Sequence, residues 1–387
     1  MEQTQHTHSR LSREATEELL RILCHGDPHG GESVRALERE FAEMVGVPHA
    51  VALNSGTAAL HLALLAHGIG PGAHVITSPL CPPGVGCAIA ATGATPVYAD
   101  IDPYAYTISP LEAERAAGSL QLQNSQPGTH NTASSAAALL AVHLFGQPCD
   151  MAALSAIARR YGLALIEVAW DALGATFHGN HVGRHGTACY SFSHGSCVST
   201  GGGGMLTTDD EVLAASVRRL ANLGCDCCGR VRQPGFNYRM TEIVAALALA
   251  QLQDVGQRVE LQSYWADQLT HGISGLRGLI PPAAAPGTVH AFQKYAVRVT
   301  RDFALNRQAV VHGLGNDGIV STLYNHLPLH LQPFNRSRSD HATALTHAER
   351  AAEELMYLPL QPNIAPSSVE RMIHVLRLMA TSTVCPE

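Results

Sequence analysis

The spacing of hydrophobic residues predicts helices and a strand near the start of the chain. Apolar residues recur at helical spacing over residues 12–23 and again over 34–45. A short apolar run at 50–53 predicts a strand. An Ala/Leu-rich run from 58 to 67 predicts a third helix, which ends at Gly68.

Farther along, short apolar runs alternate with helical stretches or Gly/Pro turns. The runs that predict buried strands are 75–76, 96–99, 138–144, 164–166 and 188–190. Strand–helix alternation is typical of an α/β domain with a mostly parallel sheet, and such sheets bind ligands at the carboxyl ends of their strands.

The C-terminal third predicts a second, smaller α/β domain. A long helical stretch from 241 to about 270 leads to a strand at 296–299 and a closing helix at 367–379. A polar stretch at 119–135 predicts a solvent-exposed loop. We expect a tail and helix over 1–29, a large domain over 30–255 and a small domain over 256–387.

Composition narrows the classes of function. The chain has 387 residues, of which 46% are hydrophobic and 15% charged, so it can bury a large core. A net charge of −7 and an aromatic content of 5% argue against nucleic-acid binding. We find no secretory signal and no apolar run long enough for a membrane span, so the ten cysteines are expected as reduced thiols in a cytoplasm.

One turn has the form of a phosphate-binding site. Ser55-Gly56-Thr57 lies between the strand at 50–53 and the helix that follows, where unpaired backbone N–H groups and the helix dipole favour an anion. The alternative is a simple helix cap, in which Ser55 or Thr57 accepts from the first turn.

The surrounding sequence resembles a known enzyme family. The stretch from Leu37 to Gly72 contains Asn-Ser-Gly-Thr-Ala-Ala-Leu-His. Further matching stretches follow in order at 93–97, 100–102, 142–148, 172–175, 235–242 and 327–332. Over about residues 30–375 the chain is similar to the DegT/DnrJ/StrS-type sugar aminotransferases, which use pyridoxal phosphate (PLP). The resemblance implies the fold-type-I PLP transferase architecture, with a large, mostly parallel sheet flanked by helices and a smaller C-terminal α/β domain.

The resemblance also implies a homodimer and a set of cofactor-binding residues. The positions matched to the cofactor phosphate are Gly56, Thr57 and Ser191, and Asn237 would reach into the partner's site. All four carry the expected residue types. On sequence alone the phosphate cup is therefore intact.

Three positions depart from the family pattern. Ser196 stands where the family has the lysine that forms the Schiff base, Val168 replaces the aspartate that pairs with the ring nitrogen, and Pro82 replaces the stacking aromatic. The only lysine of the chain is Lys294, far along in the expected small domain at a variable family position. If the protein is an enzyme, we therefore do not expect it to be an ordinary lysine-dependent transaminase.

Other polar residues surround the altered positions. Asp171, His194, Ser196 and Cys197 form a candidate set of base and nucleophile, although they are equally read as polar remnants of a decayed cavity. The run Cys225-Asp226-Cys227-Cys228 lacks paired C-x-x-C spacing, so free thiols are favoured over zinc and no metal site is expected.

Three functions remain open at this stage. The first is a repurposed, PLP-independent enzyme acting on a phosphorylated or nucleotide-linked sugar or a secondary-metabolite intermediate. The second is a non-catalytic subunit that pairs with an active homologue in a heterodimer. The third is a sugar dehydratase that uses pyridoxamine phosphate (PMP). We expect no covalently held cofactor, and non-covalent binding of PLP or PMP stays open.

Overall fold

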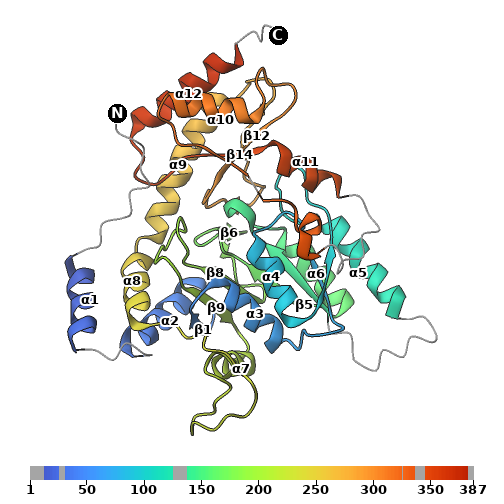
Figure 1. Cartoon of the computed structure of the whole chain (residues 1–387), viewed down its shortest axis with the longest axis vertical. Helices are drawn as coiled ribbons and strands as arrows, with labels where there is room; N and C mark the ends of the chain where they lie inside the picture. The colour runs from blue at the N-terminus through green and yellow to red at the C-terminus, as the bar shows by residue number, and fades with distance from the viewer. Residues whose placement is uncertain (1–12, 26–30, 125–136, 325, 336–344, 382–387) are drawn as a thin grey trace.

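The computed structural model describes residues 13–25, 31–124, 137–324, 326–335 and 345–381 (Figure 1). The helices are α1 (Arg13–His25), α2 (Glu32–Val45), α3 (Gly56–Ala66), α4 (Pro83–Thr92), α5 (Pro110–Asn124), α6 (Met151–Tyr161), α7 (Glu211–Ala221), α8 (Glu242–Leu252), α9 (Val255–Ile273), α10 (Arg307–Asn316), α11 (Thr346–Glu354) and α12 (Pro366–Ala380), with 3-10 turns η1 (Leu144–Gly146), η2 (Leu329–Leu331) and η3 (Pro333–Asn335).

Fourteen strands accompany these helices in the described residues. They are β1 (His49–Leu53), β2 (His74–Thr77), β3 (Thr95–Tyr98), β4 (Ala137–Val142), β5 (Ala164–Val168), β6 (Thr176–Phe177), β7 (Asn180–His181), β8 (Thr187–Ser191), β9 (Gly204–Thr208), β10 (Leu279–Ile280), β11 (Thr288–Val289), β12 (Tyr295–Val299), β13 (Thr322–Leu323) and β14 (Leu355–Leu358). Over the same described ranges, no helix is both long and apolar enough to cross a membrane.

Seven strands form the main sheet, in the order β1-β9-β8-β5-β4-β2-β3. The pairs from β8 to β3 are parallel, whereas β9 runs antiparallel to both of its neighbours. The expectation of an α/β fold with a mostly parallel sheet is confirmed. The carboxyl ends of β5 and β8 lie side by side, which brings the residues after Val168 close to those after Ser191.

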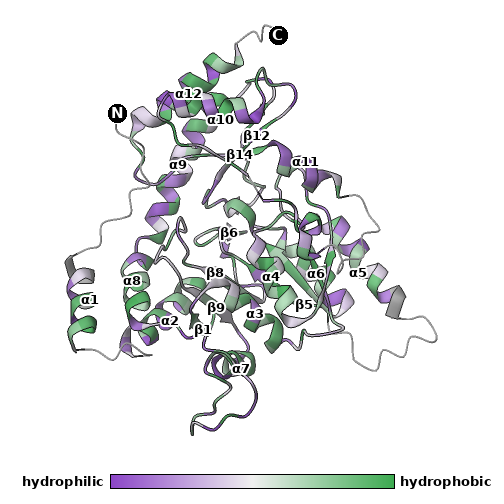
Figure 2. Ribbon diagram, viewed as in Figure 1, coloured by the Kyte–Doolittle hydropathy of each residue, from purple (hydrophilic) through white to green (hydrophobic). Residues whose placement is uncertain are grey.

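Helices cover both faces of this sheet, and successive side chains of each strand point to opposite faces. On β4, Leu140 and Val142 pack with α3, α4 and α7, whereas Leu139 and Ala141 pack with α5 and α6. Beside β1, β8 and β9, helices α2, α8 and α9 cover the second face. Apolar residues fill the strands, while the outer helices show polar faces (Figure 2). Burial of both faces explains why the strands read as apolar runs rather than as an alternating pattern.

A smaller sheet of four strands, β10-β12-β14-β13, lies in the C-terminal part. Its pairs are antiparallel, and α9, α10 and α12 supply most of the remaining core of this part. Helix α9 runs from the main sheet toward this second sheet (Figure 1). The expected domain limits at 29/30 and 255/256 stay a prediction.

Two sequence expectations need correction. The helical stretch 241–270 is two helices, α8 and α9, because the N–H of Asp254 bonds back three residues to the carbonyl of Gln251 and the regular helix ends there. The predicted loop 119–135 begins too early, since α5 continues to Asn124 and Leu120 extends the apolar spacing of Ala113 and Ala117. Residues 125–135 lie outside the described residues.

Candidate functional site

The turn between β1 and α3 is built as a helix N-terminus. The Ser55 hydroxyl accepts a hydrogen bond from the Ala58 N–H at 3.1 Å, so Ser55 caps the helix. The N–H groups of Gly56 and Thr57 belong to the first turn, where no carbonyl of the helix can accept from them. A methyl group on Gly204 would lie 2.5 Å from the carbonyl carbon of Ser55, so only glycine lets β9 approach the turn this closely.

The indole of Trp170 lies in this turn. A methyl group on Gly56 would come within 2.7 Å of Ser191 Cβ and 2.9 Å of Trp170 Nε1. On the opposite side of the ring, a methyl group on Gly84 would lie 3.0 Å from Trp170 Cη2 and 2.8 Å from Thr57 Oγ1. The indole therefore fills the space between the start of α3, the start of α4 and the end of β8.

The Trp170 ring packs against the residues that were matched to the cofactor phosphate. Its Nε1 is buried and has no hydrogen-bond partner among the described residues. Gly56, Thr57 and Ser191 are thus close together, and the Trp170 indole lies among them.

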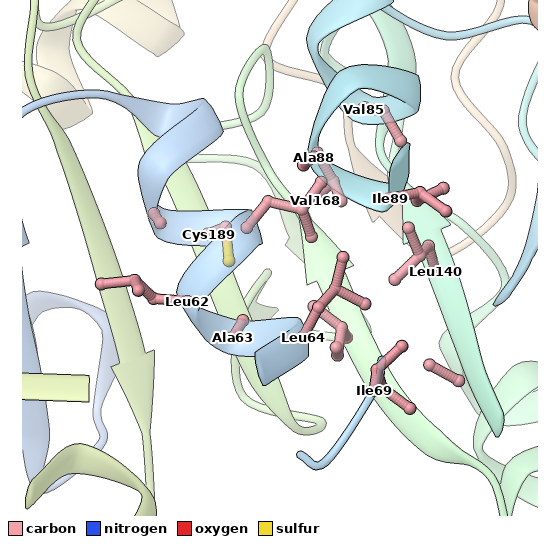
Figure 3. Close-up of a cluster of buried hydrophobic side chains, with 14 of the residues drawn as sticks. Leu62, Ala63, Leu64, Ile69, Val85, Ala88, Ile89, Leu140, Val168 and Cys189 are labelled. Carbon is pink, nitrogen blue, oxygen red and sulfur yellow. The ribbon is translucent and has the colours of Figure 1, made fainter. Parts of the chain in front are cut away.

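Val168 belongs to the core rather than to a polar site. It is 1% exposed and packs with Val85 and Ala88 of α4, as well as with Cys189 of β8 (Figure 3). A ring nitrogen placed beside it would find no carboxylate. Pro82 immediately precedes α4 and has no aromatic ring with which to stack.

Three serines connect the turn to the loop after β8. Ser191 Oγ donates to Ser193 Oγ at 3.2 Å, and the hydroxyls of Ser193 and Ser196 are 3.3 Å apart. The Ser196 N–H also donates to the Ser193 carbonyl at 3.0 Å. This hydroxyl chain holds the loop in place and leads from the filled turn toward a separate cavity.

The cavity lies between the loop 193–199, helices α8 and α9, and the four-stranded sheet. Its volume is about 680 Å³, within the usual range for ligand pockets. Three of the predicted residues line it, namely His194, Ser196 and Cys197. Burial raises the pKa of the Cys197 thiol to about 11, so at neutral pH it is a thiol and a weak nucleophile.

The fourth predicted residue, Asp171, faces a different set of groups. It is half-buried, and burial raises the pKa of its carboxyl even though Lys294, the Phe145 N–H and His326 act in the opposite direction. The structure thus brings His194, Ser196 and Cys197 to one cavity, and Asp171 interacts electrostatically with Lys294, which itself lines that cavity.

Comparison with known proteins identifies the family. A model of the DegT/DnrJ/EryC1/StrS aminotransferase family matches residues 9–377. The chain belongs to this family. Spore coat polysaccharide biosynthesis protein SpsC of Bacillus subtilis is 33% identical over 95% of this chain and 94% of its own length. GDP-perosamine synthase of Caulobacter vibrioides is 36% identical over 89% of this chain and 90% of its own.

The fold agrees with solved structures of the family. DesV of S. venezuelae, crystallised in complex with a ketimine intermediate, matches with a TM-score of 0.87 and 32% identity, covering 96% of this chain and 95% of that one. A DegT/DnrJ/EryC1/StrS aminotransferase from Brucella abortus matches with the same TM-score at 25% identity, over 95% of each chain. The fold-type-I architecture expected from the resemblance is therefore confirmed.

The predicted cofactor-binding residue Asn237 and part of the cysteine run lie at the surface. Asn237 is exposed, and its amide oxygen accepts from Arg239 Nη2 at 3.3 Å. In the nearby cysteine run, Cys227 and Cys228 are exposed, with their sulfurs 3.9 Å apart. Within the described ranges, no group of three His, Cys, Asp or Glu residues has an arrangement that could hold a metal. The predicted roles of the site residues stay predictions.

Two residues near the candidate site, Trp170 and Lys294, were not predicted from the sequence to belong to it. Trp170 follows the altered Val168 by two positions, where the family pattern has alanine, and this change in size was the available signal. Lys294 was set aside as distant, yet a methyl group on Gly195 would lie 3.3 Å from its Nζ. The pairing of these two segments across the molecule has no local sequence signature.

Proposed function

We propose that this chain does not carry out PLP-dependent transamination and instead binds a phosphorylated or nucleotide-linked sugar in the 680 Å³ cavity. The observation that carries the proposal is the position of the Trp170 indole. It packs next to Gly56, Thr57 and Ser191, in the space that a cofactor phosphate would need. Ser196 and Val168 support it, because neither an amine nor a ring-nitrogen carboxylate is present at those positions.

The sugar class is supported by the family and by the cavity. GDP-perosamine synthase is a relative whose name contains a nucleotide-linked sugar. Lys294 and Arg258 give the cavity two cationic groups, and Gln257 and Asn363 add amides at its wall. Cations bind phosphate, whereas amide groups exchange hydrogen bonds with sugar hydroxyls.

Titration with PMP tests the proposal. PMP has no aldehyde, so it cannot react with a lysine and reports only on the phosphate cup. We expect no binding to the wild type at micromolar concentration, whereas Trp170→Ala removes the ring and binds at least about tenfold more tightly. Trp170→Phe, which keeps a ring in the cup, is the matched control and should stay weak.

The wild-type titration decides the matter even if Trp170→Ala folds poorly. Isothermal titration calorimetry or equilibrium dialysis gives the dissociation constant directly. Micromolar binding of PMP by the wild type would overturn the proposal and favour a PMP-dependent dehydratase.

A second candidate is a non-catalytic subunit of a heterodimer. It is favoured by the exposed Asn237, whose amide contacts Arg239 rather than the turn at Gly56. Co-expression with an active homologue from the same genome, followed by native mass spectrometry, tests it. A stable mixed dimer supports this candidate, and two separate homodimers exclude it.

A further inference from the structure

The lysine content of the chain is the first observation. Of 25 lysine and arginine residues, only Lys294 is a lysine. Arginine supplies a positive charge but stays protonated, whereas the lysine amine can lose its proton and act as a nucleophile. Lys294 is therefore the one side chain of this sequence that carries an ε-amine.

The surroundings of Lys294 are well defined. The Lys294 N–H donates to the Phe145 carbonyl at 3.2 Å, and the preceding side chain, Gln293, donates its amide to the Gly195 carbonyl. The ε-amine ends beside Gly195, where the added methyl group would be 3.3 Å from Nζ. Contacts on both sides thus direct a half-buried amine to the loop that carries Ser196.

The cavity around this amine suits an anionic ligand. Arg258 also lines it and is held there by a 2.9 Å hydrogen bond from its Nη1 to the Cys197 carbonyl. The carboxylate among the described lining residues belongs to the exposed Asp254, 3.6 Å from Arg258. A phosphate on Arg258 would leave the rest of the ligand next to Lys294 and Ser196.

We propose that Lys294 is the reactive amine of this cavity and forms an imine with the carbonyl group of a phosphorylated sugar. The inference rests on the proposed function and names its substrate class. The nitrogen lone pair attacks the carbonyl carbon, the C–N bond forms, and the carbonyl oxygen leaves as one water with the two amine hydrogens. The step needs no oxidant, reductant or cofactor.

Asp171 acts on Lys294 through its charge rather than as a lining residue of the cavity. Its carboxyl interacts electrostatically with Lys294 and with His326, which stacks edge-on with Tyr324 at 5.5 Å. Burial raises the pKa of the Asp171 carboxyl, so it holds a proton to a higher pH than an exposed carboxyl does.

Reductive trapping tests the proposal on the full-length protein. Dihydroxyacetone phosphate and ribose 5-phosphate are the probes, with cyanoborohydride as the reductant and intact-mass and peptide mass spectrometry as the readout. We expect an adduct, with the probe's mass less one oxygen atom, on the peptide containing Lys294. Its formation should saturate with probe and be at least about tenfold faster than with dihydroxyacetone, which lacks the phosphate.

Lys294→Arg is the matched control, because it keeps the charge and removes the nucleophile. It should lose the adduct completely, while the N-terminal amine of both proteins is labelled equally. Arg258→Gln should keep the adduct but lose the preference for the phosphorylated probe. Labelling of Lys294 that does not saturate, or that is equal with and without phosphate, would overturn the proposal.

The two proposals fail separately. PMP binding to the wild type contradicts the proposed function whatever happens at Lys294. Absence of the Lys294 adduct, together with absence of PMP binding, removes the imine proposal and leaves the proposed function standing.

Discussion

Two buried polar groups near the carboxyl end of β5 differ in whether the folded chain supplies their hydrogen-bond partners. Glu167 is fully buried, and both of its oxygens are used: Oε2 accepts from His143 Nε2 at 3.0 Å and from the Gly183 N–H at 2.8 Å, and Oε1 accepts from the His185 N–H at 2.8 Å. Three residues on, the buried Nε1 of Trp170 has no partner in the described part of the chain. One position is satisfied by folding alone, and the other is not.

The Glu167 network also fixes the state of the histidine. His143 Nδ1 accepts from the Cys149 N–H at 3.0 Å, so the ring proton is on Nε2 and is donated to Glu167. Removing any member would leave a buried donor or acceptor unpaired. The difference teaches that the folded chain itself supplies every partner of Glu167, whereas its described part supplies none for the Trp170 indole N–H.

Removal of Glu167 is the largest expected effect. Glu167→Ala leaves His143 and two backbone N–H groups buried without an acceptor, so it should lower the free energy of unfolding by about 3–5 kcal/mol. Urea unfolding monitored by circular dichroism measures this change. Glu260→Ala, at an exposed position of α9, is the control and should stay within about 0.5 kcal/mol of the wild type. A Glu167→Ala protein as stable as this control would show that the network contributes little to the free energy of unfolding.

The pH dependence of stability tests the same Glu167 network, with a smaller expected effect on the free energy of unfolding. Burial alone would raise the pKa of the Glu167 carboxyl, but the hydrogen bonds from His143, Gly183 and His185 outweigh it and hold that pKa below its ordinary value. A lowered folded-state pKa adds stability above the ordinary glutamate pKa and loses it as the pH falls through the folded value.

The matching variant for this titration is Glu167→Gln, which keeps the shape and removes the charge. Its free energy of unfolding should differ most from the wild type near pH 7, and the difference should shrink as the pH falls below about 4.3. Denaturant titrations between pH 3 and pH 7 measure it. A difference that stays constant across this range would mean that the carboxyl has the same pKa in the folded and the unfolded protein, and one that grows as the pH falls would mean that its folded-state pKa is raised.

The sequence was sufficient to predict the fold. Apolar spacing located the strand at β5 and the helices α2 and α3, because burial of a helix face or a strand depends on neighbours only a few residues away. It was not sufficient for Trp170 and Lys294. The direction of the Trp170 indole depends on the space left by Gly56 and Gly84, and the approach of Lys294 to Gly195 depends on how the two sheets pack.

The smallest expected effect isolates the packing of Trp170 itself. Gly84→Ala places a methyl group 3.0 Å from two ring carbons of Trp170 and 2.8 Å from Thr57 Oγ1, so the ring must shift, at a cost of about 1–2 kcal/mol. In Trp170→Ala the ring is absent, and Gly84→Ala should cost about 1 kcal/mol less, which a double-mutant cycle measures as a coupling energy. Gly256→Ala on α9, where nothing lies within 4 Å of the added methyl group, is the control and should be neutral or slightly stabilising. Additive effects of Gly84→Ala and Trp170→Ala would mean that the indole does not occupy the cup in solution. The cup would then be open to an anion, and Glu167 and Trp170 would no longer differ in the way described above.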